Sequence, residues 1–224
     1  MVALFIVLMI AAFLLVDVIL HLRKQPALAE QLRARVEAGM AAPRIAGFRM
    51  VPDAAYHPGH TWARHIRHGV AQVGVDDFAA RLIGKPDRVE LPAVGTQVRA
   101  GRPVMTLERK GRRIPVVAPV TGIVSAVNRA AQMKPGDLVA DPYASWLVEV
   151  KSAELSYDFR ALMSGEMARR FFDEAAAALH AYFAPPNMAL AAADGGVALD
   201  GIGDQLDEAT WDRVRSRFLL TDVD

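Results

Sequence analysis

Short segments with the composition of β-strands follow one another between Tyr56 and Lys151, each bounded by glycine or proline. "TWARHI" and "VAQVGV" flank "RHG", which is typical of a hairpin. A single helix is predicted among them at "DDFAARLIG", with Asp76 or Asp77 as its cap and Gly84 as its end. Many short strands at even spacing, joined by such turns, predict a small β-barrel or sandwich over residues 51–152.

A long apolar run precedes this domain and covers Val2–Leu20, with Asp17 as its one charged residue. A helix of that length spans about 28 Å, close to the roughly 30 Å of bilayer hydrocarbon. Nothing basic precedes the run, whereas Arg23 and Lys24 follow it, which is the reverse of a signal peptide. The positive-inside rule therefore predicts a transmembrane anchor at residues 1–22 of an inner-membrane protein, with the N-terminus outside and the C-terminal domain cytoplasmic.

Asp17 is costly inside a membrane-spanning helix. It can snorkel towards Arg23 or the lipid headgroups, or it can contact another membrane helix and make the chain a subunit of a larger assembly. Both explanations remain open, so Asp17 is a candidate contact residue. Residues 23–50 are predicted to form a juxtamembrane helix that begins near Pro26, followed by a short linker.

A helical extension is predicted over residues 153–224, after the β-domain. Ser164 can cap "GEMARRFFDEAAAALHAYF", and Asp207 can cap a last short helix that carries Trp211 and Phe218. The aromatic side chains are expected to pack against one another, against the β-domain or against a partner, and these alternatives stay open.

Composition and motifs exclude several classes of function. The chain has no cysteine, which removes disulfides, thiolate metal sites and cysteine nucleophiles. Its net charge of +1 gives no signature of nucleic-acid binding. The glycines of "DGGVALDGIGDQL" lack the strand and helix context of a dinucleotide site, and there is no P-loop. We therefore predict a protein that is not an enzyme.

Four histidines fall within twelve residues, namely His57, His60, His65 and His68. Imidazole is the commonest metal ligand, so a metal site has to be considered. No carboxylate cluster accompanies the histidines at metal-ligand spacing. The sequence therefore predicts no metal site.

Five blocks of the β-region occur in an order that resembles a known family. They are Tyr56 with His60 and Trp62, then "VGVDDFAARLIG", "VELPAVGTQVRAG", "APVTGIVSAVN" and "DPYASWLVEVK". These blocks resemble the H protein of the glycine cleavage system, in the lipoyl/biotinyl-domain superfamily. The resemblance implies a mainly β barrel-sandwich hybrid, to which the N-terminal transmembrane helix and the C-terminal helical extension are added. It does not by itself imply the activity.

The stretch "TLERKGRRIPVVAPVTG" covers the region where this family carries its lipoyl lysine. The family places that lysine three residues after a glutamate and eight before a proline, here Glu108 and Pro119. Both counts reach Gly111, and Lys110 lies one residue earlier. A shift of one residue along a strand turns a side chain to the opposite face, so the resemblance implies that the lipoyl position is a glycine. At a tight turn, however, Lys-Gly could form the central pair and Lys110 could still project outward.

Four cations surround this predicted turn, namely Arg109, Lys110, Arg112 and Arg113. They can form a solvated turn that needs no ligand, or they can contact an acidic partner or anionic lipid headgroups. We favour the contact with a partner or with lipid. All four are therefore candidate contact residues.

The predicted function is that of a non-enzymatic, single-pass membrane protein with a cytoplasmic H-protein-like domain and no cofactor. Its partners would be other subunits of a membrane complex, such as one that handles electrons, and it would serve there as an accessory or scaffold subunit. The alternative is a membrane-tethered lipoyl carrier, modified on Lys110 and related to the glycine cleavage system. A third prediction is a lipid-surface binding module that depends on Arg109, Arg112 and Arg113.

Overall fold

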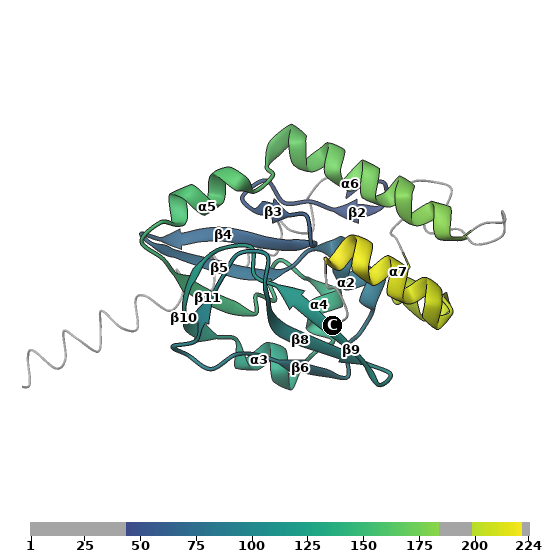
Figure 1. The fold of residues 1–224 in the computed structure, drawn as a ribbon, viewed down its shortest axis with the longest axis horizontal. Helices are drawn as coiled ribbons and strands as arrows, with labels where there is room; N and C mark the ends of the chain where they lie inside the picture. The colour runs from purple at the N-terminus through teal and green to yellow at the C-terminus, as the bar shows by residue number, and fades with distance from the viewer. Residues whose placement is uncertain (1–43, 184–198, 221–224) are drawn as a thin grey trace, which may run out of the picture. The chain divides into compact units, whose positions relative to one another are not determined.

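The computed structural model describes residues 44–183 and 199–220 of the chain (Figure 1). The strands are β1 (Arg44–Ile45), β2 (Phe48–Arg49), β3 (Ala55–His57), β4 (Thr61–Arg67), β5 (Val70–Val75), β6 (Arg88–Glu90), β7 (Gln97–Val98), β8 (Pro103–Arg109), β9 (Arg112–Val117), β10 (Gly122–Val127) and β11 (Val148–Lys151). The helices are α2 (Asp77–Ile83), α3 (Arg129–Met133), α4 (Asp137–Ala140), α5 (Leu155–Ala161), α6 (Gly165–His180) and α7 (Glu208–Leu219), with short 3₁₀ turns η1 (Ala181–Phe183) and η2 (Ile202–Gln205).

The described strands form three antiparallel sheets. A six-stranded sheet has the order β3-β4-β5-β11-β10-β7, a three-stranded sheet has the order β6-β8-β9, and β1 pairs with β2. The predicted hairpin around "RHG" is β4 and β5, in which Trp62 pairs with Gly74 across the strands. The mainly β class predicted from the sequence is confirmed by these sheets.

The predicted helix ends are confirmed at two of three helices. The Asp76 carboxylate accepts the backbone N–H of Ala79 at 2.9 Å and so caps α2, which ends at Gly84. Asp207 caps α7 in the same way. Ser164 precedes α6 as predicted, but its side chain makes no capping hydrogen bond.

The last residues of the predicted linker instead form the β1–β2 ribbon and join the core. The Phe48 ring lies 4.9 Å from the Phe78 ring, measured between centroids. The backbone N–H of Arg49 donates to the buried Asp77 carboxylate at 2.8 Å, and the Arg49 guanidinium pairs with the same carboxylate. Two-residue strands show no measurable periodicity, so a pattern search could not have found this ribbon.

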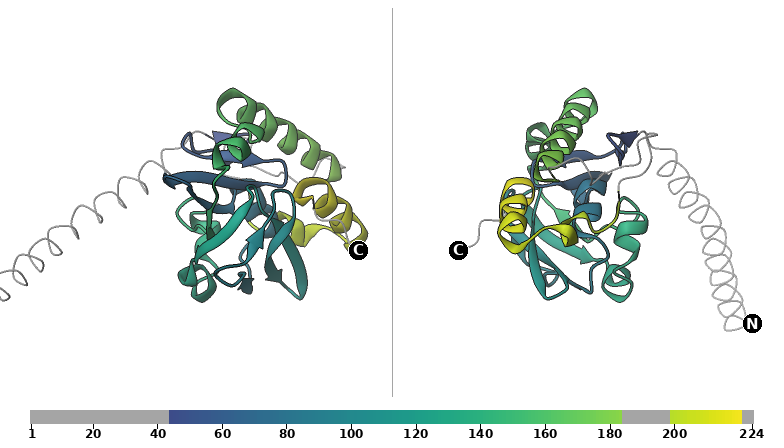
Figure 2. Two further views of the ribbon diagram at one scale, coloured as in Figure 1. Left: turned by 60° about the vertical axis from the view of Figure 1, so that its left-hand side comes forward. Right: turned by 90° about the vertical axis from the view of Figure 1, so that its right-hand side faces the viewer.

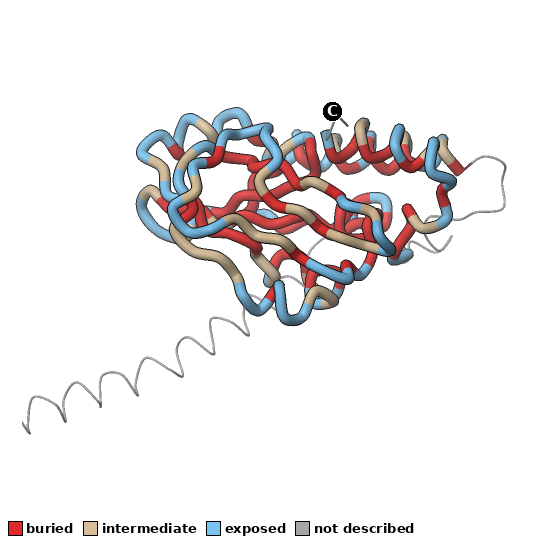
Figure 3. Tube along the Cα trace, turned by 60° about the horizontal axis from the view of Figure 1, so that its bottom comes forward, coloured by how far each residue is buried: buried red, intermediate tan, exposed pale blue. Residues whose placement is uncertain are grey.

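The described C-terminal helices share one core with the sheets. Helix α6 lies over β2 and β3 in Figure 1, and Figure 2 shows the same green helix beside the early strands from two further sides. The Phe172 ring of α6 meets the Tyr56 ring of β3 at 5.2 Å. Phe218 of α7 lies 5.2 Å from Phe78 of α2. Figure 3 shows buried residues continuing from the strands into these helices. Of the three arrangements left open, the described aromatic residues of the extension show two: they pack against the β-domain and also against one another, as Tyr182 and Phe218 do at 6.2 Å.

Among the helices in residues 44–183 and 199–220, none is both long and apolar enough to cross a bilayer. The predicted anchor at residues 1–22, with Asp17, lies outside the described residues. The same holds for residues 23–43 of the predicted juxtamembrane segment.

Candidate functional site

The tip of the β8–β9 hairpin consists of two residues. Arg109 pairs with Arg112 as the last rung of the ladder, which leaves only Lys110 and Gly111 in the turn. Both have left-handed backbone conformations, with φ of +49° at Lys110 and +77° at Gly111. Two successive positive φ angles are the pattern of a type I′ turn, whose twist matches that of the paired strands. Lys110 therefore lies at the tip, where the alternation of faces along a strand no longer applies.

The Lys110 side chain is 65% exposed, and its Nζ lies 3.0 Å from a carboxylate oxygen of Asp204. Its backbone N–H donates to the Asp87 carboxylate at 2.6 Å, which fixes the turn against the segment before β6. A Cβ built on Gly111 would meet no heavy atom within 4 Å. The amine is thus reachable from solvent, beside open space, and is held by one carboxylate.

Arg109 and Arg113 also have partners within the chain. The Arg109 guanidinium donates to both carboxylate oxygens of Asp204 and to the backbone carbonyl of Lys85. Arg113 pairs with Glu90 at 2.6 Å. These ion pairs raise the pKa of both guanidinium groups, chiefly through the hydrogen bonds to Asp204 and Glu90.

Arg112 lies beneath the C-terminal segment. Its guanidinium donates to the backbone carbonyls of Gly203 at 3.2 Å and Leu206 at 3.5 Å. The same group lies 5.3 Å from the centre of the Trp211 ring, within the range of a cation–π contact. Contact of the hairpin cations with a partner or with lipid remains a prediction, but each of the four already has an intramolecular neighbour.

Asp204 is the acidic centre of the site. Partial burial alone would raise its pKa, but hydrogen bonds from Arg109 and Lys110 outweigh this and hold the pKa below its ordinary value. Asp204 is therefore ionised at neutral pH. The sequence gives no signal for this role of Asp204, because its partners Arg109 and Lys110 lie far from it along the chain.

The four histidines do not converge on one site. His60 is fully buried, and its Nδ1 lies 2.8 Å from Asp76. His57 accepts the backbone N–H of Gly59 at 3.0 Å, and burial lowers its pKa. Within the described residues, no three side chains of the histidine, cysteine, aspartate and glutamate types come together as a metal site would require.

Asp76 both caps α2 and pairs with His60, so Asp76→Ala should destabilise the fold. We expect a loss of about 2–4 kcal/mol, made of about 1 kcal/mol for the cap and about 1–3 kcal/mol for a buried imidazole left without its partner. Urea unfolding followed by circular dichroism would measure it. The exposed Asp173→Ala on α6 is the control and should change stability by less than about 0.5 kcal/mol. Equal stability of the two variants would contradict the structural role of Asp76.

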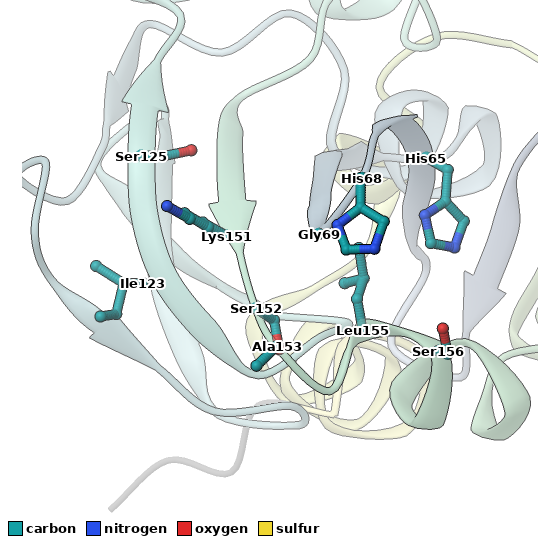
Figure 4. Close-up of a pocket in the computed structure, with 10 residues that line it drawn as sticks. All are labelled: His65, His68, Gly69, Ile123, Ser125, Lys151, Ser152, Ala153, Leu155 and Ser156. Carbon is teal, nitrogen blue, oxygen red and sulfur yellow. The ribbon is translucent and has the colours of Figure 1, made fainter.

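A separate pocket of about 620 Å³ opens between the end of the β4–β5 hairpin and the strands β10 and β11. His65 and His68 line one side, and Ile123, Ser125 and Lys151 line the other (Figure 4). None of the hairpin-tip residues lines it. The pocket is therefore not part of the site at the hairpin tip.

Sequence comparison places this domain among known proteins. Residues 54–175 match the family model described as glycine cleavage H-protein. A probable glycine cleavage system H protein of Thermococcus gammatolerans is 33% identical over 118 residues, which cover 53% of this chain and 88% of that protein. The glycine cleavage system H protein of Mycobacterium avium is 35% identical over 122 residues, covering 53% of this chain and 92% of that one. The crystal structure of an H protein from Mycobacterium marinum is similar with a TM-score of 0.46 and 27% identity, over 56% of this chain and 98% of that one.

The matched residues define a lipoyl-type β-domain of the H-protein kind. The chain belongs to the glycine cleavage H-protein family. The resemblance predicted from the five sequence blocks is thus confirmed. The match ends at residue 175, so Asp204 and Trp211 lie beyond it.

The predicted location is wrong. The relatives are glycine cleavage system H proteins, and no helix in the described ranges is suited to cross a bilayer. The assignment as a single-pass protein of the inner membrane rested on residues 1–22, which lie outside the described residues. Positive-inside reasoning orients an apolar segment once it is in a membrane, and it does not establish that the segment enters one.

Proposed function

We propose that this protein is a carrier without enzyme activity of its own, and that it bears a lipoyl group in amide linkage to Nζ of Lys110. The observation that supports the proposal is the position of Lys110 at the tip of a two-residue turn, with its side chain 65% exposed. The family relationship supports it as well, since H proteins carry lipoyl on a lysine of this hairpin. The transfer reaction served would belong to glycine cleavage or to a related one-carbon or redox process.

The residues at the tip fit such a group. The amine lies at the surface, and the absence of a side chain at Gly111 leaves space on the other half of the turn. Asp87 fixes the turn by accepting the backbone N–H of Lys110, and the lysine side chain can extend once its Nζ leaves Asp204. A bound lipoyl group would supply a dithiolane that can be reduced and can carry a reaction intermediate.

The one-residue offset between Lys110 and the family position at Gly111 is compatible with this proposal. The two residues are the central pair of one turn and have similar backbone conformations, with φ of +49° and +77°. A modifying enzyme that approaches the tip would reach a lysine amine at position 110 as well as at position 111. The argument from strand alternation concerns residues within a ladder, and neither residue belongs to one.

Intact mass measurement of the full chain tests the proposal. The protein would be produced in cells that modify their own H protein, and its mass would be compared with the mass of the unmodified sequence. We expect one lipoyl group for each chain, and peptide mapping should place it on Lys110. An unmodified chain from cells whose own H protein is fully lipoylated would count against the carrier.

A second candidate is an H-protein-like interaction subunit that has lost its lipoyl group. It is favoured by the ion pair between Lys110 and Asp204 and by the count that places the family's lysine on Gly111. In that case the mass would be unmodified, and the chain should remain bound to a partner protein during mild purification. The same sample therefore separates the two candidates.

A further inference from the structure

The segment from Asp200 to Leu219 lies beyond the matched family region, and it packs on the proposed lipoyl hairpin. Helix α7 lies next to β9 (Figure 1), and η2 contacts α2. Arg112 of the hairpin donates to two backbone carbonyls of this segment. A segment beyond the matched family region therefore contacts the hairpin directly beside the tip at which modification is proposed.

Close packing fixes this segment independently of Lys110. A Cβ on Gly203 would lie 2.3 Å from the Trp211 ring and 2.8 Å from the carbonyl oxygen of Leu82, so only glycine fits there. Ile202 and Trp211 are buried, with 1% and 4% of their surface exposed. Asp204 directly follows Gly203 in the chain. The packing around Gly203 therefore holds the Asp204 backbone in place beside the hairpin tip.

Asp204 contacts two cations that differ in chemistry. Arg109 donates to both carboxylate oxygens and keeps its charge at all pH values relevant to a folded protein. Lys110 makes the remaining contact at 3.0 Å, and its amine loses its positive charge when it is acylated. Acylation of Lys110 would therefore remove one of the two cations that Asp204 contacts.

We propose that Asp204 is a positioning residue that holds the Lys110 amine in an ion pair at 3.0 Å and so restrains its acylation, which has to break that contact. The inference rests on the proposed function in naming the lipoyl donor as the natural acylating substrate. The nitrogen that attacks an acyl donor has to leave the Asp204 carboxylate, and the amide that forms carries no charge with which to pair again. The two effects are reciprocal. Packing of residues 200–219 on the hairpin opposes acylation of Lys110 by the same free energy by which acylation weakens that packing.

Acetylation by a limiting amount of acetic anhydride measures this restraint without any lipoyl enzyme. The neutral amine attacks one carbonyl carbon, an amide forms, acetate leaves and the proton goes to solvent. Mass spectrometry would give the acetylation of Lys110 relative to the exposed Lys134 in the same molecule. In Asp204→Asn we expect this ratio to rise by about two- to fivefold, the range given by an ion pair that is partly exposed to solvent.

Two further variants separate positioning from a general loosening of the segment. Asp204→Glu keeps the carboxylate and should return the ratio towards that of the natural chain. Asp200→Asn removes the same charge from the same segment, but Asp200 pairs with Arg81 and does not contact Lys110. It should leave the ratio unchanged. An unchanged ratio in Asp204→Asn, or an equal rise in Asp200→Asn, would overturn the inference.

Failure of this inference can be told from failure of the proposed function. The acetylation ratio is measured on chain produced without lipoylation, so that the Lys110 amine is free. If cells lipoylate Lys110 but the ratio of the unmodified chain is unaffected by Asp204→Asn, the carrier stays and the role of Asp204 is removed. A chain that is never lipoylated but shows the rise would keep the positioning role and remove the carrier.

Discussion

Lys110→Arg should abolish lipoyl attachment while leaving the fold and its stability close to those of the natural chain. A guanidinium stays protonated and is not acylated, so no amide can form at the tip. Arginine keeps the positive charge and can still pair with Asp204, as the neighbouring Arg109 does. Intact mass of the variant from lipoylating cells, together with its thermal unfolding curve, would check both halves of the expectation.

A matched control for this variant is Lys134→Arg. Lys134 is an exposed lysine just after α3, away from the hairpin, so its replacement should leave the lipoyl adduct in full. If Lys110→Arg still gained the mass of a lipoyl group, the attachment would lie elsewhere. The tip of β8–β9 would then lose its assignment as the site of modification.

The parts of the fold that the sequence predicted are those determined by neighbouring residues. The β4–β5 hairpin follows from two strand-like runs around "RHG", and the caps of α2 and α7 follow from Asp76 and Asp207. Each signal lies within one short stretch of neighbouring residues, where turn and capping chemistry act. The β1–β2 ribbon, whose strands have two residues each, gives no such signal, and the sequence predicts a linker in its place.

The candidate site was predictable only in part, for the same reason. The pair Lys110–Gly111 has the chemistry of a two-residue turn, and the sequence left open that this lysine projects outward. Asp204 lies 95 positions from Arg109 along the chain, and only the folded structure brings the two together. The prediction that the cations meet a partner or lipid overlooked this long-range contact, because charge patterns carry no information about distant segments.

The N-terminal prediction shows a different limit. An apolar run followed by Arg23 and Lys24 satisfies the length and charge rules for a membrane anchor. Those rules use only the length and flanking charges of the apolar segment. They take no account of the family to which the following domain belongs. The location drawn from them is contradicted by the family relationship, whereas the prediction that used five ordered blocks of the β-domain is confirmed.

Trp211→Ala should lower the free energy of unfolding by about 3–5 kcal/mol, the usual cost of removing a buried aromatic side chain from a core. Trp211 is 4% exposed, its ring fills the space above Gly203, and the Arg112 guanidinium lies 5.3 Å from it. No small residue can fill this volume, because the backbone of Gly203 is held between the ring and Leu82. Urea unfolding followed by circular dichroism would measure the loss.

The expected loss also discriminates between two views of the C-terminal extension. Tyr157→Ala, at a side chain that is 72% exposed, removes a comparable aromatic group and should cost less than about 0.5 kcal/mol. If Trp211→Ala lowered the free energy of unfolding no more than that control, the extension would not be part of the core. Asp204 would then not be held in a fixed position beside Lys110. If the full loss is seen, the extension belongs to the same folding unit as the β-domain, and the packed core holds Asp204 beside Lys110.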